Sequence, residues 1–556
     1  MAGQKFEMIF KDPLPLSRSE YPGFNHRTEE EKDMTIEYDV AVPMRDDIKI
    51  FIDLYRPEVE GKYPVIVCWG PYGKQGRSQI YGLLGNTGLN DEDFNKYTAF
   101  EAADPVYWCR NGFIIINADP RGSWKSEGKL TFMSPQEAED CYDLIEWAGA
   151  QSWSNGKIGM MGVSYLAWTQ WKVAALNPPH LAAINPWEGV SDFYRELCFH
   201  GGIPETRFEK ILMTSWCFST TRVEDFLEMK RRHPFFDDYW ASKNADLSKI
   251  TVPAFVVASW TDHGLHNRGT LEGFKKIASK DKWLLVHGRK KWWHFYKEEN
   301  MEKQRQFFNR FLKGIDNHVQ DWPRVTLEIR EKYYVGSTRT ENEWPLTRTK
   351  YTKLYLNAGN GKIGKTPFKE QSQVRYNVND VEDKTQNAKF EFKFKNNTEL
   401  TGHMKLKLWI QADGSDDMDL FVAIEKIDRA GYLVPFPFFG NHDDGPVALG
   451  WLRISHRELD KDKSTPYQPI HKHQREIKLK RGEIVPVEIE IWPSCTLFET
   501  GERLRIWIQG SDIYWYPEER HTVGHTATVN KGDHVIYTGG KYDSHLLVPV
   551  IPIDRT

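Results

Sequence analysis

Three apolar runs in the first third of the chain constrain its fold more than any other feature. They are Tyr63–Trp69, Phe113–Ala118 and Ile158–Gly162, and turn residues follow each of them. A continuous apolar run is typical of a strand buried on both faces of a parallel sheet. Helical patterns at Pro135–Ala148 and Tyr165–Leu176 alternate with the runs. The sequence therefore predicts an α/β sheet with its functional groups at the carboxyl ends of the strands.

The start of the first predicted helix is well marked. Ser134 fits the N-cap and Pro135 fits the first helical position. Glu137 has the capping-box spacing, so its side chain can reach back to the N–H of Ser134.

Domain boundaries follow from changes of pattern along the 556 residues, a length that exceeds one ordinary core. Aromatic and charged residues at helical spacing interrupt the α/β pattern, and short alternating strands with few helices follow it. We predict an irregular arm at 1–34, an α/β unit at 35–190 and 251–323, a helical insertion at 191–250, and an all-β sandwich at 324–556.

Composition narrows the range of partners. A formal net charge of −4 gives no support for a nucleic-acid or membrane partner, and no stretch has the length of a membrane span. The polar segment at 1–22 lacks a signal-peptide pattern, so we expect a cytoplasmic location. With no Cys-x-x-Cys pair and no histidine cluster at zinc spacing, we expect no metal and no cofactor. We expect buried free thiols at Cys68, Cys109, Cys141, Cys198, Cys217 and Cys495.

A candidate nucleophile follows the third apolar run. In Gly162-Val163-Ser164-Tyr165, a serine lies between a predicted strand and a predicted helix, which is the pattern of a nucleophile elbow. The five-residue form Gly-x-Ser-x-Gly is incomplete, because Leu166 holds the last position and Ala167 is the nearest small residue. An ordinary strand-to-helix turn is the alternative.

A serine nucleophile needs a histidine and a carboxylate. In α/β hydrolases the acid and then the histidine follow the serine along the chain. Asp262 follows a resumed strand at Val252–Trp260, although a turn residue or helix N-cap is an equal reading. His287 and His294 follow the next strand, and the choice between them is open. His263 and His266 also flank Asp262, but they share its strand end and fit a wall of the site better.

Two donors are candidates for an oxyanion hole. The backbone N–H of Tyr165, next after the serine, is the standard first donor. The hydroxyl of Tyr72, in the loop Gly70–Lys74, can supply a second, although a loop tyrosine is more often a packing residue.

Several separated motifs in one order resemble those of the cocaine esterase/X-Pro dipeptidyl-peptidase family, the CocE/NonD hydrolases. They are Gly70–Lys74, Asp119–Ser123, Ser126–Gly128, Gly162–Tyr165, Trp260–Asp262, Thr398–Gly402 and Asp416–Phe421. The resemblance implies an α/β hydrolase fold with a helical cap insertion and a C-terminal all-β jelly-roll domain. It also implies a small-molecule substrate whose ester or amide bond is cleaved through an acyl-enzyme; a homo-oligomer is left open.

The resemblance further implies roles for single residues. Ser164, Asp262 and a histidine form the triad, and Tyr72 works with the N–H of Tyr165 in the oxyanion hole. The family commonly carries Gly-Pro-Trp-x-His, whereas this chain has His287-Gly288-Arg289-Lys290-Lys291. Trp292-Trp293-His294 keeps a Trp-x-His pattern, but the strand end holds a base most rigidly. We predict His287 as the catalytic base.

Two other functions compete with hydrolysis. The aromatic-rich insertion suits acyl transfer or cyclisation on a specialised metabolite at the same site. The irregular histidine segment suits a non-catalytic protein that keeps the hydrolase fold. A dipeptidyl-peptidase needs an acidic anchor for a free amino terminus, for which Glu188 and Glu196 are candidates.

Overall fold

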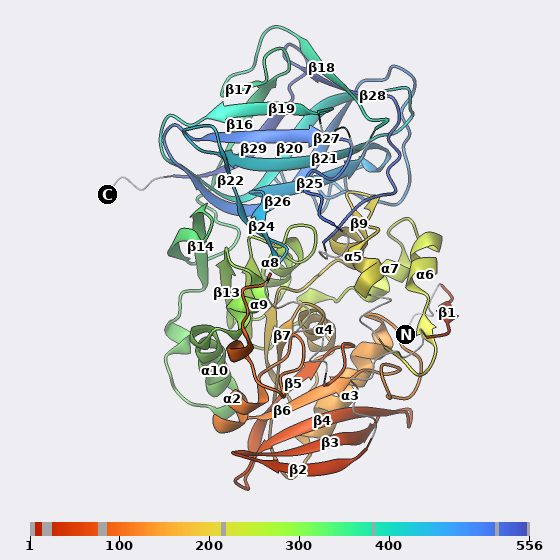
Figure 1. Cartoon of the computed structure of the whole chain (residues 1–556), viewed down its shortest axis with the longest axis vertical. Coiled ribbons are helices and arrows are strands. Elements are labelled where there is room, and N and C mark those ends of the chain that lie inside the picture. The colour runs from red at the N-terminus through yellow and green to blue at the C-terminus, as the bar shows by residue number, and fades with distance from the viewer. Residues whose placement is uncertain are drawn as a thin grey trace.

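The computed structural model describes residues 6–13, 25–75, 86–212, 218–380, 383, 385–517 and 522–552. Figure 1 shows an α/β part below a β-rich part, with the short helices of the insertion between them on one side. Within the described residues, none of the helices combines the length and the apolar character that crossing a membrane requires.

The α/β part is built on one mixed sheet. From β6 to β14 all neighbouring strands are parallel, as the apolar runs predict. Antiparallel strands complete both edges. In sheet order the strands are β2 (Arg27–Glu31), β3 (Met34–Pro43), β4 (Lys49–Pro57), β6 (Ile114–Asp119), β5 (Tyr63–Trp69), β7 (Ser154–Val163), β8 (Leu181–Trp187), β12 (Ala254–Ser259), β13 (Lys282–His287), β14 (Val325–Lys332) and β15 (Val335–Glu341).

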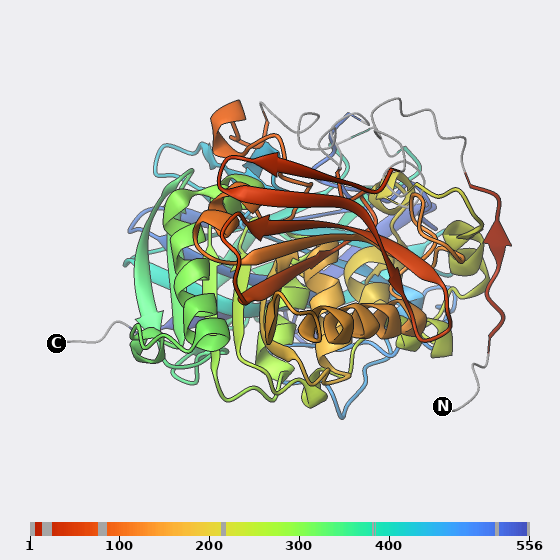
Figure 2. The ribbon, with the colours of Figure 1, turned by 90° about the horizontal axis from the view of Figure 1, so that it is seen from below.

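One edge of this sheet departs from the predicted irregular arm. Arg27–Glu31 forms strand β2, which pairs with β3 at the edge of the sheet. Side chains alternate between the two faces along both strands, so β2 extends the sheet by one strand. Figure 2 shows β2, β3 and β4 across the end of the molecule farthest from the C-terminal part.

Helices cover both faces of the sheet. Apolar residues of α3 (Pro135–Gly149), α4 (Tyr165–Ala174) and α8 (Asn267–Lys276) pack in one core cluster. Those of α2 (Pro105–Arg110), α9 (Lys291–Tyr296) and α10 (Glu298–Lys313) pack in the cluster on the other face. The residues of α3 that pack in the first of these clusters are Cys141, Leu144, Ile145 and Ala148.

The N-terminus of α3 matches its predicted cap in part. The hydroxyl of Ser134 accepts a hydrogen bond from the N–H of Glu137, at 3.1 Å. The Glu137 carboxylate, however, accepts from the N–H of Met133 at 2.7 Å and not from that of Ser134. The same carboxylate also accepts from the hydroxyl of Tyr165, so it ties α3 to the residue that follows Ser164.

The insertion at 191–250 contains short helical segments around an aromatic core that includes Tyr194 and Trp240. Short strands also occur there, which the helical prediction does not include. The elements are a π-helical turn (Tyr194–Cys198), β9 (Phe199–His200), β10 (Ile203–Pro204), α5 (Phe208–Ile211), β11 (Val223–Glu224), α6 (Phe226–Arg232), α7 (Asp238–Lys243) and a 3₁₀ turn (Leu247–Lys249); β11 pairs with β1 (Phe10–Lys11).

The C-terminal part is β-rich, with two groups of paired strands around one aliphatic core. The first group is β17 (Lys362–Gly364), β16 (Lys350–Asn357), β29 (His545–Ile551), β20 (Thr398–Asp413) and β26 (Val485–Phe498), with β28 (Asp533–Thr538) and β18 (Ser372–Asn377) along β20. The second is β19 (Ala388–Lys393), β27 (Arg503–Gln509), β21 (Asp419–Ile427), β25 (Ala448–Arg453) and β22 (Leu433–Val434). A hairpin of β23 (Phe436–Phe438) and β24 (His442–Gly445) and 3₁₀ turns at Asp91–Asp93, Val319–Asp321 and Ile454–His456 complete the described elements.

The two parts are joined by specific contacts. Arg330 of β14 pairs with Thr496 of β26, so the two sheets meet at that point. The N–H of Phe439, just after β23, donates to the carbonyl of Thr261 at 3.0 Å, one residue before Asp262. The C-terminal part therefore reaches the carboxyl end of β12, where the sequence predicts the acid of the site.

The thiols follow the prediction within the described residues. The five free cysteines there are all buried, namely Cys68, Cys109, Cys141, Cys198 and Cys495. Cys217 lies outside the described residues.

Candidate active site

Ser164 lies in a strained turn between β7 and α4. Its backbone has φ 60° and ψ −118°, a conformation that non-glycine residues rarely adopt. Its N–H donates to the carbonyl of Trp187 at 2.9 Å, which fixes the turn to the neighbouring strand. Such strain is typical of an exposed nucleophile held at a strand end.

Small residues explain how the elbow tolerates Leu166 in place of glycine. The side chain of Leu166 packs over Gly162 and Gly70, where a methyl group on either glycine would come within 2.5 Å of it. Gly162 also has φ 138°, which favours glycine. Gly162 and Gly70 therefore provide the room that the Leu166 side chain needs.

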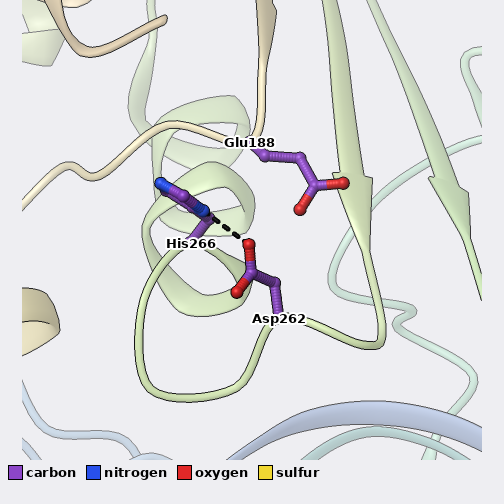
Figure 3. A group of neighbouring side chains, drawn as sticks. All are labelled: Glu188, Asp262 and His266. Atoms are coloured by element: carbon purple, nitrogen blue, oxygen red, sulfur yellow. Dashed lines mark hydrogen bonds and ion pairs between the residues drawn. The ribbon is translucent and has the colours of Figure 1, made fainter. Parts of the chain in front are cut away.

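His266 connects Ser164 to Asp262. Its Nε2 lies 3.1 Å from the hydroxyl oxygen of Ser164, and its Nδ1 lies 2.5 Å from Oδ2 of Asp262. Figure 3 shows Asp262 in the loop after a strand and His266 at the start of the following helix, with the bond between them dashed. The three side chains form a continuous hydrogen-bonded chain, and all are buried.

The loop between β12 and α8 brings Asp262 and His266 together. The chain reverses at Gly264, which has φ 90°, and a methyl group there would lie 2.8 Å from Val523. The N–H of Asn267 then donates to the carbonyl of Asp262 at 3.1 Å and closes the loop. This local turn carries His266 back over the carboxylate.

His287 does not have the position predicted for the base. Its Nδ1 accepts from the N–H of Arg289 at 3.1 Å. Its Nε2 faces Glu188 Oε1 at 3.2 Å, an ion-pair distance without hydrogen-bond geometry. The two ring nitrogens thus face Arg289 and Glu188, whereas the hydroxyl of Ser164 is bonded to His266.

The other histidines lie around the site. The ring of His294 packs against that of His287 at a tilt of 41°, with centroids 4.1 Å apart, and its Nδ1 faces Asn300. His263 lies against Trp492 and accepts from the N–H of Leu449, which fits its predicted wall position. His266, assigned to the wall from the sequence, instead contacts the serine.

Both predicted oxyanion residues lie beside the elbow. The ring of Tyr72 packs edge-on against Tyr165, with centroids 6.1 Å apart, and against Phe100. The Tyr72 hydroxyl interacts with the Glu101 carboxylate. The Glu101 carbonyl in turn accepts from the N–H of Val163, so this loop borders the nucleophile turn.

A buried lysine completes the group around Asp262. Lys291, at the start of α9, donates to Oδ2 of Asp262 at 2.8 Å and lies 3.2 Å from Nδ1 of His266. Glu188, Asp262 and His266 hold ligand atoms within 4.8 Å of one another, a spacing that could suit a metal ion (Figure 3). The Lys291 ammonium supplies a positive charge at that place, so the carboxylates already have a cation within the protein.

Burial and charge set the protonation of the group. Burial alone would raise the pKa of Asp262, but the Lys291 ammonium and His266 hold it well below its usual range. Burial raises the pKa of Glu188 well above its ordinary value and that of Glu101 to about 8. Burial, followed by the charge of Lys291, lowers the pKa of His266 to about 4. At neutral pH the imidazole is therefore neutral and beside an ionised Asp262.

Family models match both parts of the chain. The model described as X-Pro dipeptidyl-peptidase (S15 family) matches residues 46–222. The model described as X-Pro dipeptidyl-peptidase C-terminal non-catalytic domain matches residues 317–547.

Known proteins with the same organisation are similar over nearly the whole chain. A CocE/NonD family hydrolase from Staphylococcus aureus is 46% identical, with a TM-score of 0.89 over 93% of this chain and 94% of that one. Cocaine esterase from Rhodococcus sp. (strain MB1 Bresler) is 23% identical over 92% of this chain and 98% of its own. An α-amino acid ester hydrolase, at 17% identity and a TM-score of 0.70, covers 97% of this chain and 100% of its own and shares the fold.

The strand-to-helix serine and these similarities define a serine hydrolase. The chain belongs to the CocE/NonD hydrolase family, in which X-Pro dipeptidyl-peptidase-like proteins are included. If Gly288 is matched to the glycine of the Gly-Pro-Trp-x-His pattern, the histidine position falls on Trp292. The indole of Trp292 donates to Glu101 at 2.9 Å.

Proposed function

We propose that the protein hydrolyses an ester or amide bond of a small organic substrate through an acyl-enzyme, with Ser164, His266 and Asp262 as its triad. The observation that carries this proposal is the unbroken chain from the Ser164 hydroxyl through both ring nitrogens of His266 to Asp262. In this proposal His266 takes the role predicted for His287 from the sequence.

Each group has a defined step. Ser164 Oγ attacks the substrate carbonyl carbon while its proton passes to Nε2 of His266. The imidazolium then gives that proton to the leaving alcohol or amine, and the carbonyl carbon remains bonded to Ser164. Water, activated by His266, repeats the sequence and releases the carboxylic acid. Asp262 holds the Nδ1 proton and stabilises the imidazolium formed in each half.

The developing oxyanion needs donors aimed at it, each contributing about 3 kcal/mol to the lowering of the barrier. We assign this role to the N–H of Tyr165 and the hydroxyl of Tyr72. The edge-on packing of the Tyr72 ring against the Tyr165 ring places Tyr72 beside the elbow and supports the assignment.

Substrate choice belongs, in this proposal, to the residues that surround the triad. We assign β2, β14 and β15 to the α/β-hydrolase domain because they pair in its sheet. The bounds predicted as 35–190 and 251–323 then become 27–190 and 251–341, with 191–250 as a helical cap and 342–556 as a jelly-roll domain. The contact of Phe439 with Thr261 supports a part for the last domain in shaping the site.

The contacts of Glu188 and Glu196, the two candidate anchors for a free amino terminus, favour an ester substrate over an X-Pro peptide. Glu196 already accepts from Arg268 and from two backbone N–H groups of its own turn. Glu188 is buried against Ser259 and His287. Both side chains are also fully buried, which disfavours contact with a free amino terminus.

A fluorophosphonate probe and a neutral aryl ester test the proposal. Wild-type protein should be labelled and should release the phenol with a burst. Ser164→Ala should lose both, by about 10³-fold or more in rate. Ser154→Ala is a matched control, because Ser154 lies at the opposite end of the same strand. Unchanged labelling of the Ser164 variant, or none of the wild type, contradicts the proposal, and an X-Pro anilide tests the peptidase alternative.

A further inference from the structure

Lys291 and His266 share one oxygen of Asp262. The ammonium of Lys291 lies 2.8 Å from Oδ2 and the Nδ1 of His266 lies 2.5 Å from the same atom. Lys291 comes from α9 and its side chain is 3% exposed, whereas the acid and the histidine come from the β12–α8 loop. Two separate elements therefore fix one carboxylate.

The ammonium is surrounded by carboxyl groups from three segments. Asp262 follows β12, Glu188 follows β8, and Glu101 borders the elbow, and each of them acts to raise the pKa of Lys291 against the lowering effect of burial. Lys291 consequently stays charged although it is buried. The bond to Asp262 is its closest contact with this group.

The charge of Lys291 acts in opposite directions on its two neighbours. An ammonium beside a carboxylate favours the ionised form, and an ammonium beside an imidazole disfavours the imidazolium. At 3.2 Å from Nδ1, the positive charge of Lys291 opposes protonation of His266 before substrate binds. During the reaction, Asp262 still faces the imidazolium and offsets that repulsion.

We propose that Lys291 is a positioning residue of the hydrolase site, which holds Asp262 ionised and in place and keeps His266 in its neutral, proton-accepting form. This inference rests on the proposed function. Lys291 itself neither gains nor loses a proton: the serine proton moves to Nε2 of His266 and from there to the leaving group.

Residues of the C-terminal part help to hold Lys291 in position. The Lys291 ammonium lies 5.6 Å from the ring centroid of Phe439 in that part and 4.8 Å from that of the neighbouring Trp292. At Gly440, which has φ 78°, a methyl group would come within 3.4 Å of the Lys291 side chain. These contacts leave the side chain little room, so the ammonium stays against Asp262.

A purely structural role for Lys291 makes a different prediction. If the charge of Lys291 only balances the buried acidic side chains, its loss lowers stability. Activity then falls by the same factor at every pH, and the pH profile keeps its shape. If it holds His266 neutral, its loss makes the imidazole easier to protonate. The acid side of the kcat/KM profile then moves to higher pH, because this side reports the base in the free enzyme.

The experiment compares Lys291→Met with Lys290→Met on the full-length protein, using the neutral aryl ester. Lys290 is a matched buried lysine whose ammonium bonds to the carbonyl of Asn86 and to Asp443 instead. For Lys291→Met we expect the acid half-point of kcat/KM to rise by at least about one pH unit. Lys291→Arg should keep the wild-type half-point, and Lys290→Met should leave it unchanged.

The outcomes separate this inference from the proposed function. Absence of Ser164 labelling in the wild type overturns the function itself. Normal labelling with an unshifted half-point in Lys291→Met overturns only the role of Lys291. Lys291→Gln, which keeps an N–H donor without the charge, serves if the methionine variant does not fold. A wild-type half-point near 6.5, the ordinary pKa of histidine, also overturns the inference, because a charged Lys291 beside His266 must lower it.

Discussion

The imidazole of His266 is bound at 2.5 Å by the carboxylate of Asp262, which lies only four residues earlier in the chain. Acid and histidine thus come from one loop after β12, and their relative orientation is set by the local turn through Gly264. Ser164 is the one member of the group that comes from a distant strand. Because one loop carries both His266 and Asp262, no second loop is needed to orient the histidine. The segment after β13 supplies Lys291 instead.

Substituting the two competing histidines should separate their roles. We expect His266→Gln to lower kcat by about 10³-fold or more, because the proton acceptor of Ser164 is lost. His287→Gln should stay within about tenfold of wild type, because Gln can still donate toward Glu188. Steady-state kinetics with a neutral aryl ester measures both.

Thermal unfolding is the control for these variants, since both side chains are buried. A collapse of kcat in His287→Gln at unchanged stability, with a mild effect in His266→Gln, would restore the assignment made from the sequence.

The fold could be predicted largely from local pattern. The buried runs at Tyr63–Trp69 and Ile158–Gly162 specify strands with two covered faces, and the structure has them in the parallel region of the sheet. The strand at Arg27–Glu31 could not be predicted in this way. Its five residues are mostly charged, and it exists because β3 offers an edge to pair with.

The site could be predicted only in part, for a geometric reason. The elbow at Ser164 is a local feature, and so is the position of Asp262 at a strand end. The direction of a histidine ring depends on the path of the loop that carries it. From the sequence, His266 is predicted to line the wall because it shares a strand end with Asp262. The turn at Gly264, however, brings its ring into contact with the Asp262 carboxylate. A histidine four residues after the acid, with a glycine between them, is the signal that the sequence offers.

The pH dependence of the wild type follows from the state of His266. Burial first, and Lys291 second, lower the pKa of this imidazole to about 4 from an ordinary 6.5. The neutral form is the base, so kcat/KM falls only as the pH drops through the lowered value. We expect the acid half-point near 4, measured with a neutral ester over short times and with folding followed by circular dichroism. A half-point near 6.5 in folded protein would contradict the burial and charge effects described for His266.

Arg330 is the basis of a prediction about stability. Its buried guanidinium bonds to the carbonyls of Trp260, Val447 and Cys495 and to the hydroxyls of Ser494 and Thr496. Burial lowers its pKa to about 10, so it remains charged at neutral pH and joins the two parts of the molecule.

Replacing Arg330 by Met would leave these acceptors buried without a donor, at a cost of about 3 kcal/mol. We expect Arg330→Met to lower Tm by roughly 5 °C. Arg375→Met is the matched control, because Arg375 is 44% exposed and pairs with Asp413 and Asp533 at the surface. Exposed ion pairs contribute at most about 1 kcal/mol, so its Tm should change little. Equal melting of Arg330→Met and the wild type would show that this contact does not stabilise the joint between β14 and β26.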